Sequence, residues 1–175
     1  MCGIAGYIGK TKFKPTEQQL KNCLASLQRR GPDSKGINII RNGDHILQFI
    51  HTRLSIVDLS KSSNQPFEDE DGIIIFNGMI YNFLELKNDL KKRGVFFRTN
   101  SDTEVLLKML NIYGKNSFKY LDGMWSFAYF NKKKSKILMS RDRFGEKPLY
   151  FVNTQKGIFF SSDIKSLLLY SKIKP

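Results

Sequence analysis

The sequence predicts an α+β fold in which helices cover the surfaces of β-sheets. Helical patterns fall into two groups between many short strand patterns, whereas βαβ units would alternate helix and strand. The length of 175 residues, with 41% hydrophobic and 26% charged residues, is that expected of one domain with a substantial core. We therefore expect one domain built from covered sheets.

The first half of the chain contains a clear helix and a clear hairpin. Thr16 and Gln19 have the spacing of a capping box, and apolar residues follow at helical intervals, namely Leu20, Cys23, Leu24 and Leu27. Gly31-Pro32-Asp33 ends this helical region. Residues 37–40 and 45–49 are predicted strands joined by Asn42-Gly43, a typical hairpin turn. The helix places Cys23 on its core face, where we expect an inert thiol.

The middle of the chain contains a polar loop, a buried strand and two helices. We expect a loop over 58–72 and a strand over 73–76 that is buried on both sides. Capping patterns predict where the two helices start. Asn82 with Glu85 begins a helix that ends near residue 93, and Ser101 with Glu104 begins the helix that follows it.

The last third is predicted to be mostly strands. The expected strands cover residues 124–131, 136–142, 149–153 and 157–161. Asp163 is then expected to cap a short helix that runs through Leu169. Residues 165–175 have the character of an approach to a domain boundary.

Composition argues against several classes of protein. The net charge is +13, but the Lys and Arg residues are spread along the chain, and their one tight cluster, Lys132 to Lys136, lies in a predicted hairpin turn. Nucleic-acid-binding proteins concentrate such charge on one face, so we interpret it as a solvated surface and expect no nucleic-acid partner. The sequence leaves open whether this basic surface steers anionic ligands by long-range electrostatic attraction.

The cellular setting is predicted from what the sequence lacks. No apolar stretch is long enough to span a membrane, and the start has no signal-peptide pattern. Two cysteines form no disulfide framework, and together with His45 and His51 they show no zinc-ligand spacing. We expect a cytoplasmic protein with no metal and no membrane contact.

Cys2 is the leading candidate for a catalytic residue. If Met1 is removed, Cys2 carries a thiol and a free α-amine in one residue. A thiol of pKa about 8.5 needs a base to become a good nucleophile, and an α-amine of pKa about 7.7–8 is such a base. The alternative is that Cys2 is a small apolar residue at the start of a buried strand.

Three further positions carry polar groups that suit an amino-acid amide substrate. Arg53 stands before an apolar run and needs a carboxylate, either from a ligand or from an internal Asp. Asn77-Gly78 offers an amide and a backbone N–H for an oxyanion, or is an ordinary turn. Asp102 offers an anion for an ammonium, or is a helix-start charge. Together with Cys2 they match glutamine.

The chain resembles the glutaminase domain of asparagine synthases, which belong to the class II, N-terminal nucleophile glutamine amidotransferases. Matching segments occur in the family's order along nearly the whole chain: Cys2 to Gly6, Arg30 to Asp33, Arg53 to Asp58, Asn64 to Pro66, Asn77 to Asn82, Ser101 to Glu104, Leu121 to Met124 and Arg141 to Tyr150. The resemblance implies a four-layer αββα sandwich and a glutamine amidotransferase type-2 domain over residues 1–175.

The resemblance also implies roles for individual residues. Cys2 would be the nucleophile and its α-amine the base, and Asn77 with the Gly78 N–H would hold the oxyanion. Residues of the 53–58 segment would bind substrate, and we assign this role to Arg53 for the α-carboxylate, together with Ile56 and Val57. Asp102 would bind the α-ammonium. No cofactor is expected for this reaction.

Two residues depart from the family pattern. Met79 replaces a Glu that usually follows Asn-Gly, which leaves Asp102 alone to hold the ammonium and predicts weaker glutamine affinity or altered amine selectivity. Arg29 stands where a His is common, and nothing in the sequence explains that change.

The family's ATP-dependent synthetase domain is absent from these residues, because no Ser-Gly-Gly-rich pyrophosphate loop occurs. We expect ATP and magnesium only for that domain, which would be a partner domain or subunit that converts aspartate to asparagine. A homodimer of the full-length form is also expected. Two alternatives stay open: the glutaminase part of a polysaccharide-modifying amidotransferase, and a catalytically silent interaction domain.

Overall fold

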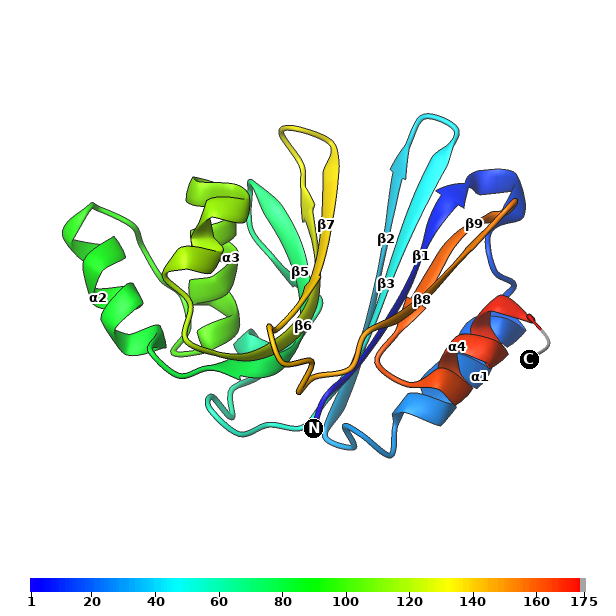
Figure 1. Ribbon diagram of the computed structural model, residues 1–175, viewed down its shortest axis with the longest axis horizontal. Coiled ribbons are helices and arrows are strands. Elements are labelled where there is room, and N and C mark those ends of the chain that lie inside the picture. The colour runs from blue at the N-terminus through cyan, green and yellow to red at the C-terminus, as the bar shows by residue number, and fades with distance from the viewer. Residues whose placement is uncertain (174–175) are drawn as a thin grey trace.

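The computed structural model describes residues 1–173 as two facing antiparallel sheets with helices on their outer sides (Figure 1). The first sheet contains, in order across it, β2 (Ser34–Asn42), β3 (His45–Arg53), β1 (Gly3–Lys10), β9 (Gly157–Ser161) and β8 (Tyr150–Thr154). The second contains β4 (Phe67–Glu68), β5 (Gly72–Ile80), β6 (Gly123–Asn131) and β7 (Lys136–Arg141).

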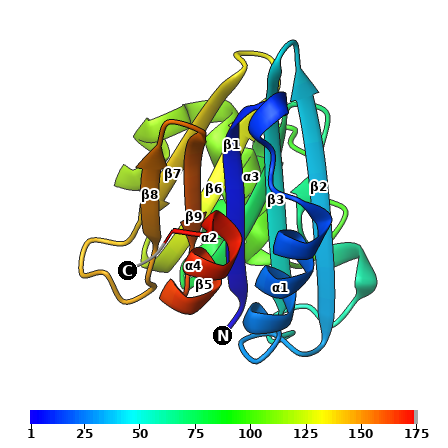
Figure 2. The ribbon, with the colours of Figure 1, turned by 90° about the vertical axis from the view of Figure 1, so that its right-hand side faces the viewer.

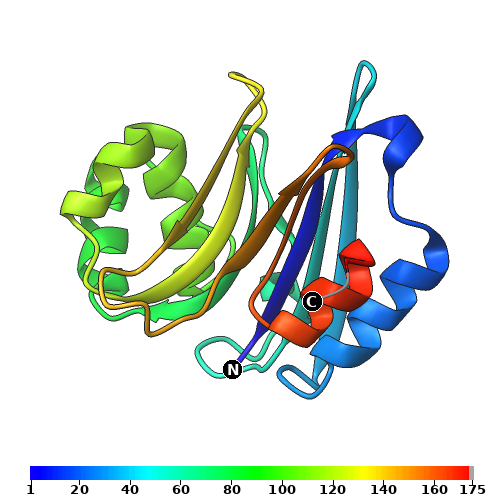
Figure 3. The ribbon, with the colours of Figure 1, turned by 45° about the vertical axis from the view of Figure 1, so that its right-hand side comes forward.

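Each sheet carries its own pair of helices. The first is covered by α1 (Glu17–Leu27) and α4 (Ile164–Ser171), which lie side by side across its outer face in Figure 2. The second is covered by α3 (Asp102–Tyr113), with α2 (Phe83–Lys92) packed against α3. Figure 3 shows the resulting four layers in the order helix, sheet, sheet, helix. The four-layer αββα sandwich predicted from the resemblance is confirmed.

Three apolar layers hold the sandwich together. Between the sheets pack side chains such as Ile4, Phe49 and Phe160. Beneath α1 and α4 lies a layer that includes Tyr7 and Cys23. Beneath α3 lies a layer that includes Phe76, Leu106 and Phe127. Full burial of a large apolar side chain contributes about 1.5–3 kcal/mol, so these layers fix the two sheets face to face.

Most predicted elements form, and α1 forms for the predicted reason. Thr16 accepts a hydrogen bond from the Gln19 N–H at 3.2 Å, and the Gln19 side chain accepts one from the Thr16 N–H at 2.9 Å. Cys23 is fully buried, and burial raises its pKa to about 12, as expected of an inert core thiol. Asp163 caps α4 through the Ser166 N–H at 2.8 Å.

Two capping predictions were wrong in their chemistry. Asn82 precedes α2 but makes no side-chain cap; its amide instead donates to the Tyr120 carbonyl at 2.8 Å. Ser101 does cap α3, yet the Glu104 carboxylate turns away from Ser101. It accepts from the Thr99 N–H at 2.7 Å and from the Arg98 N–H at 2.9 Å. Both side chains therefore fasten neighbouring loops to the helices.

The second sheet differs from expectation in two places that bear on function. The expected loop over 58–72 contains a short 3-10 helix, Lys61–Ser63, and the two-residue strand β4. The expected strand over 73–76 continues to Ile80, so Asn77 and Gly78 lie inside β5. The interpretation of Asn77-Gly78 as an ordinary turn is wrong, because both residues pair with β6.

Within residues 1–173, the helices are all too short or too polar to cross a membrane. The same residues contain no cluster of three or more His, Cys, Asp or Glu side chains arranged to hold a metal ion.

Candidate active site

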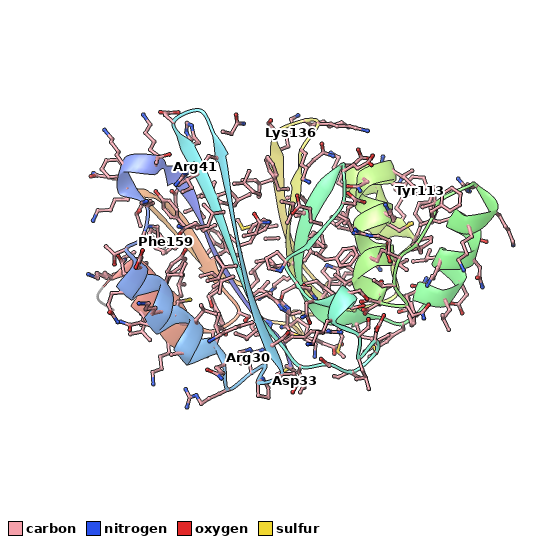
Figure 4. All side chains as sticks on the ribbon, turned by 180° about the vertical axis from the view of Figure 1, so that it is seen from behind. Arg30, Asp33, Arg41, Tyr113, Lys136 and Phe159 are labelled. Carbon is pink, nitrogen blue, oxygen red and sulfur yellow. The ribbon has the colours of Figure 1, made fainter. Side chains whose placement is uncertain are left out.

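The N-terminus lies at one end of the sandwich (Figure 1). A pocket lined by Met1 and Cys2 opens at this end. It contains about 640 Å³ of empty space, its open mouth included. Figure 4 shows Arg30 and Asp33 at this same end, opposite Arg41 and Lys136 on the hairpins. The pocket lining includes every residue that the sequence nominated: Cys2, Arg53, Ile56, Val57, Asn77, Gly78 and Asp102.

Cys2 stands just before β1, a central strand of the first sheet. Its Sγ lies 3.4 Å from the Leu54 N–H, which donates to it, and 3.6 Å from the Leu54 carbonyl. The Arg30 Nε donates to the Cys2 carbonyl at 3.1 Å. These contacts hold the thiol at the pocket wall.

Burial raises the pKa of the Cys2 thiol above its ordinary value. The Leu54 N–H and the positive charges of the N-terminus and Arg53 act in the opposite direction, whereas the Asp102 carboxylate adds to the rise. A thiol in this environment needs a nearby base to ionise at neutral pH. Met1 precedes Cys2 in this structure, so the nitrogen of Cys2 is here a peptide nitrogen.

The segment Arg30-Gly31-Pro32-Asp33 connects the strand ends around Cys2. The Asp33 N–H donates to the Arg53 carbonyl at 3.0 Å, and the Asp33 carboxylate accepts from the Ser55 N–H at 2.7 Å. Gly31 fits against Thr52 so closely that a Cβ would lie 2.3 Å from the Thr52 carbonyl oxygen. The segment therefore shapes the pocket wall on the side of Arg53.

Gly78 presents its N–H to the pocket. Trp125 lies opposite it on β6, and both backbone groups of Trp125 are already bonded to Asp142. The Trp125 N–H donates to Asp142 Oδ2 at 3.2 Å, and the Asp142 N–H donates to the Trp125 carbonyl at 2.8 Å. Gly78 and Trp125 are therefore a non-hydrogen-bonded pair, in which the Gly78 N–H points away from β6.

The neighbouring N–H groups on that edge of β5 are occupied. Successive N–H groups of a strand point to opposite edges, so those of Phe76, Gly78 and Ile80 share one edge. The Phe76 N–H donates to Gln65 Oε1 at 2.6 Å, and the Ile80 N–H donates to Asp102 Oδ2 at 3.1 Å. Strand β4 pairs only with Ile73 and Ile74 of β5, which precede this stretch. The Gly78 N–H is thus the group on this stretch that stays available for a ligand.

Asn77 lies beside this donor and is 1% exposed. Its Nδ2 donates to the Ser126 hydroxyl on β6 at 3.4 Å, a long hydrogen bond. A buried amide and a free backbone N–H next to each other are suitable donors for an oxyanion.

Arg53 ends β3 and is 6% exposed. Its Nη1 donates to the Asn64 side chain at 2.7 Å and to the Ser60 carbonyl at 2.9 Å, and its Nη2 donates to the Asp58 carbonyl. Within residues 1–173, no carboxylate lies within ion-pair distance of its guanidinium. The interpretation of an internal Asp partner is wrong. The buried cation is held by neutral oxygens, which leaves its charge for a ligand.

Asp102 begins α3, so it is a charge at a helix start, and it is 5% exposed. Burial raises the pKa of this carboxyl to about 6, and the Ile80 N–H is the leading influence in the opposite direction. The carboxylate is ionised at neutral pH and lies on the pocket wall.

Ile56 and Val57 lie in the loop after Arg53, and their side chains are 64% and 36% exposed. Sequence reasoning gave no role to Gln65 or Lys147, yet both are buried in the lining. The Lys147 Nζ lies 3.5 Å from the Met1 Sδ. Both residues belong to segments that match the family. Membership of these segments was the one sequence feature that pointed to them as pocket residues.

Comparison with known proteins decides the family. The protein-family model described as "Glutamine amidotransferase domain" matches residues 1–175. The chain belongs to this family. The putative glutamine-hydrolyzing asparagine synthetase 2 of Methanocaldococcus jannaschii is 38% identical over 191 residues, which cover 99% of this chain and 36% of that protein. The glutamine-hydrolyzing asparagine synthetase 1 of Bacillus subtilis is 38% identical over 174 residues, which cover 97% of this chain and 27% of that protein.

This glutamine amidotransferase domain is homologous to the glutaminase part of those synthetases, as the motifs predicted, and it spans about a third of their length. A solved structure gives the fold. The glutamine phosphoribosylpyrophosphate amidotransferase of B. subtilis, complexed with ADP and GMP, superposes with a TM-score of 0.76 at 22% identity. The match covers 97% of this chain and 43% of that one. At this identity the likeness establishes the shared fold alone.

Proposed function

We propose that the chain hydrolyses glutamine to glutamate and ammonia, with Cys2 as the nucleophile after removal of Met1. The observation that carries this proposal is the single pocket around Cys2, which gathers a thiol, a free N–H, an unpaired cation and a buried carboxylate. These are the groups that an amino-acid amide requires.

The pocket supports a definite placement of glutamine. The Arg53 guanidinium binds the α-carboxylate and the Asp102 carboxylate binds the α-ammonium, while the exposed Ile56 and Val57 cover the substrate. The side-chain amide oxygen then accepts hydrogen bonds from the Asn77 Nδ2 and the Gly78 N–H. This leaves the amide carbon exposed to attack by the Cys2 Sγ.

The chemistry follows covalent catalysis. The α-amine of Cys2 takes the thiol proton, and Sγ attacks the amide carbon to form a tetrahedral oxyanion. The carbon–nitrogen bond breaks, and the leaving nitrogen takes the proton and departs as ammonia. Water then adds to the γ-glutamyl thioester, the carbon–sulfur bond breaks, and glutamate and the thiol are released.

The acceptor of the ammonia is proposed from the relatives. Both synthetases named above are about three to four times as long as this chain, so a synthetase domain or subunit is the natural consumer of ammonia. We place this function in the cytoplasm, with aspartate as the acceptor and ATP with magnesium used by the synthetase. A homodimer of the full-length form stays a prediction.

The test is glutamate release from glutamine by the purified chain and by three variants. Cys2→Ala is expected to abolish turnover. Asn77→Ala is expected to lower kcat by about 10²–10³, which is typical for loss of one oxyanion donor. Ser126→Ala is the matched control, because it removes only the partner of Asn77 and leaves the amide in place. Turnover that survives Cys2→Ala would refute the nucleophile, and an effect of Asn77→Ala confined to KM would refute its oxyanion role.

A further inference from the structure

We infer that Gln65 is a positioning residue that sets the distance between the two ends of the substrate site, and thereby selects the length of the substrate side chain. The inference rests on the proposed glutaminase function and deepens it. Gln65 is 7% exposed and belongs to the Asn64-Gln65-Pro66 segment, which carries no role in the chemistry described above.

The side chain of Gln65 joins two separate elements. Its Oε1 accepts from the Phe76 N–H on β5 at 2.6 Å, and its Nε2 donates to the Thr103 hydroxyl on α3 at 3.2 Å. Phe76 directly precedes the oxyanion donors Asn77 and Gly78. Thr103 directly follows Asp102. One amide group therefore connects the strand that holds the reacting end of the substrate to the helix that holds its amino end.

Contacts to the first sheet fix the segment that contains Gln65. The backbone of Gln65 packs against β2, where a Cβ on Gly36 would lie 2.1 Å from the Gln65 carbonyl oxygen. Asn64, the preceding residue, accepts from Arg53 at 2.7 Å and from the Ser34 hydroxyl at 3.1 Å. The segment thus also holds the carboxylate-binding cation, and its position is fixed by contacts to the first sheet.

A second hydrogen bond joins the same two elements, but its acceptor is Asp102, which the proposal assigns to the substrate ammonium. The Ile80 N–H donates to Asp102 Oδ2 at 3.1 Å, and an incoming ammonium competes for that carboxylate. The Gln65 amide bonds to the Phe76 N–H and the Thr103 hydroxyl, neither of which binds glutamine in the placement proposed above. Beside the apolar packing of α3 on β5, it is therefore a polar link between these elements for which the bound ammonium does not compete.

A fixed spacing discriminates between amides of different length. Asparagine has one methylene fewer than glutamine, so with its ammonium and carboxylate bound, its amide falls short of the Gly78 N–H. One methylene is worth about 10–200-fold in discrimination when the site is rigid. A site in which α3 can shift against β5 loses part of this selectivity.

The experiment compares kcat/KM for L-glutamine and L-asparagine in the full chain with Met1 removed. Thr103→Val severs the link at α3 and leaves the Phe76 hydrogen bond in place. We expect it to lower kcat/KM for glutamine about tenfold, the factor for one lost hydrogen bond of about 1.4 kcal/mol, and to lower the glutamine-to-asparagine ratio by a similar factor. Gln65→Leu severs both links and is expected to lower the ratio further.

Thr103→Ser is the matched control, because it retains the hydroxyl and is expected to restore the ratio. A smaller fraction of folded enzyme would reduce both activities equally, so the ratio reports positioning and not stability. An unchanged ratio in Thr103→Val would overturn the inference while the glutaminase function stands. Absence of glutamine turnover in the unmodified chain would instead refute the proposed function, and this inference with it.

Discussion

Gly78 on β5 and Trp125 on β6 face each other as a non-hydrogen-bonded pair, and this pairing turns the Gly78 N–H toward the pocket that contains Cys2. The cause lies one strand further away, because Asp142 occupies both backbone groups of Trp125. The Asp142 carboxylate also accepts from the Lys147 N–H at 3.0 Å. One residue, through its backbone N–H and its carboxylate, thus occupies Trp125 and fastens the loop that brings Lys147 to the pocket.

A side chain at position 78 is expected to damage both stability and activity. A Cβ there would lie 2.1 Å from the Met124 carbonyl oxygen, which is backbone and cannot move aside. We expect Gly78→Ala to lower the free energy of unfolding by about 1–3 kcal/mol, the usual cost of overpacking, and to reduce kcat through displacement of the N–H. Denaturant unfolding and glutamate release measure the two effects.

Gly43→Ala provides the comparison. Gly43 has open space around its Cβ position but a φ of +59°. The variant should lose about 1–2 kcal/mol through left-handed backbone strain and retain full glutaminase activity. Equal activity in Gly78→Ala and Gly43→Ala would remove Gly78 from the oxyanion site.

Glutamine affinity is expected to fall as the pH drops through about 6. Burial raises the pKa of the Asp102 carboxyl to about 6, and only the ionised form binds an ammonium. The KM for glutamine should therefore rise on acidification across that value. In Asp102→Asn the KM should be high and should lack this pH dependence. A KM of the unmodified protein that stays flat between pH 5 and 8 would remove Asp102 from ammonium binding.

The same group affects stability with a defined sign. Between the ordinary Asp value of 3.8 and about 6, the folded chain holds this proton more tightly than the unfolded chain does. The contribution of Asp102 to stability therefore decreases as the pH rises through that window. Asp102→Asn should remove this part of the pH dependence, which denaturant unfolding at several pH values detects.

Met79 is expected to limit the affinity for glutamine. It lines the pocket opposite Met124 on β6, so this part of the wall is apolar, and in the proposed placement of glutamine the ammonium is left to Asp102. Met79→Glu should lower the KM for glutamine, because it adds a second carboxylate near the ammonium. Met79→Leu controls for the change in shape and should leave the KM near its original value. A higher KM in Met79→Glu would contradict this account.

Local patterns predicted most of the elements, since capping residues and apolar spacing act within a few residues. They failed where a distant contact decides the outcome. Asn77-Gly78 has the composition of a turn, but pairing with β6 keeps it extended. Glu104 has capping-box spacing, but the loop N–H groups at Arg98 and Thr99 take its carboxylate.

The site was predictable where a residue type carries its chemistry alone, as with Cys2, Arg53 and Asp102. Gln65 was not, because a glutamine has many uses and only the three-dimensional structure places its amide between β5 and α3. The sequence nominated the Gly78 N–H as an oxyanion donor, but it did not predict that this N–H makes no hydrogen bond to β6. That follows from the pairing of Trp125 with Asp142, which lies 17 residues further along the chain.

The central claim is that the α-amine of Cys2 is the base for its own thiol. The most direct test is glutamate release by two samples of the same chain, one starting at Cys2 and one retaining a single preceding residue, with each N-terminus verified by intact mass. We predict turnover only in the sample that starts at Cys2, because an acylated nitrogen cannot accept the thiol proton. Equal turnover in both samples would contradict the N-terminal mechanism.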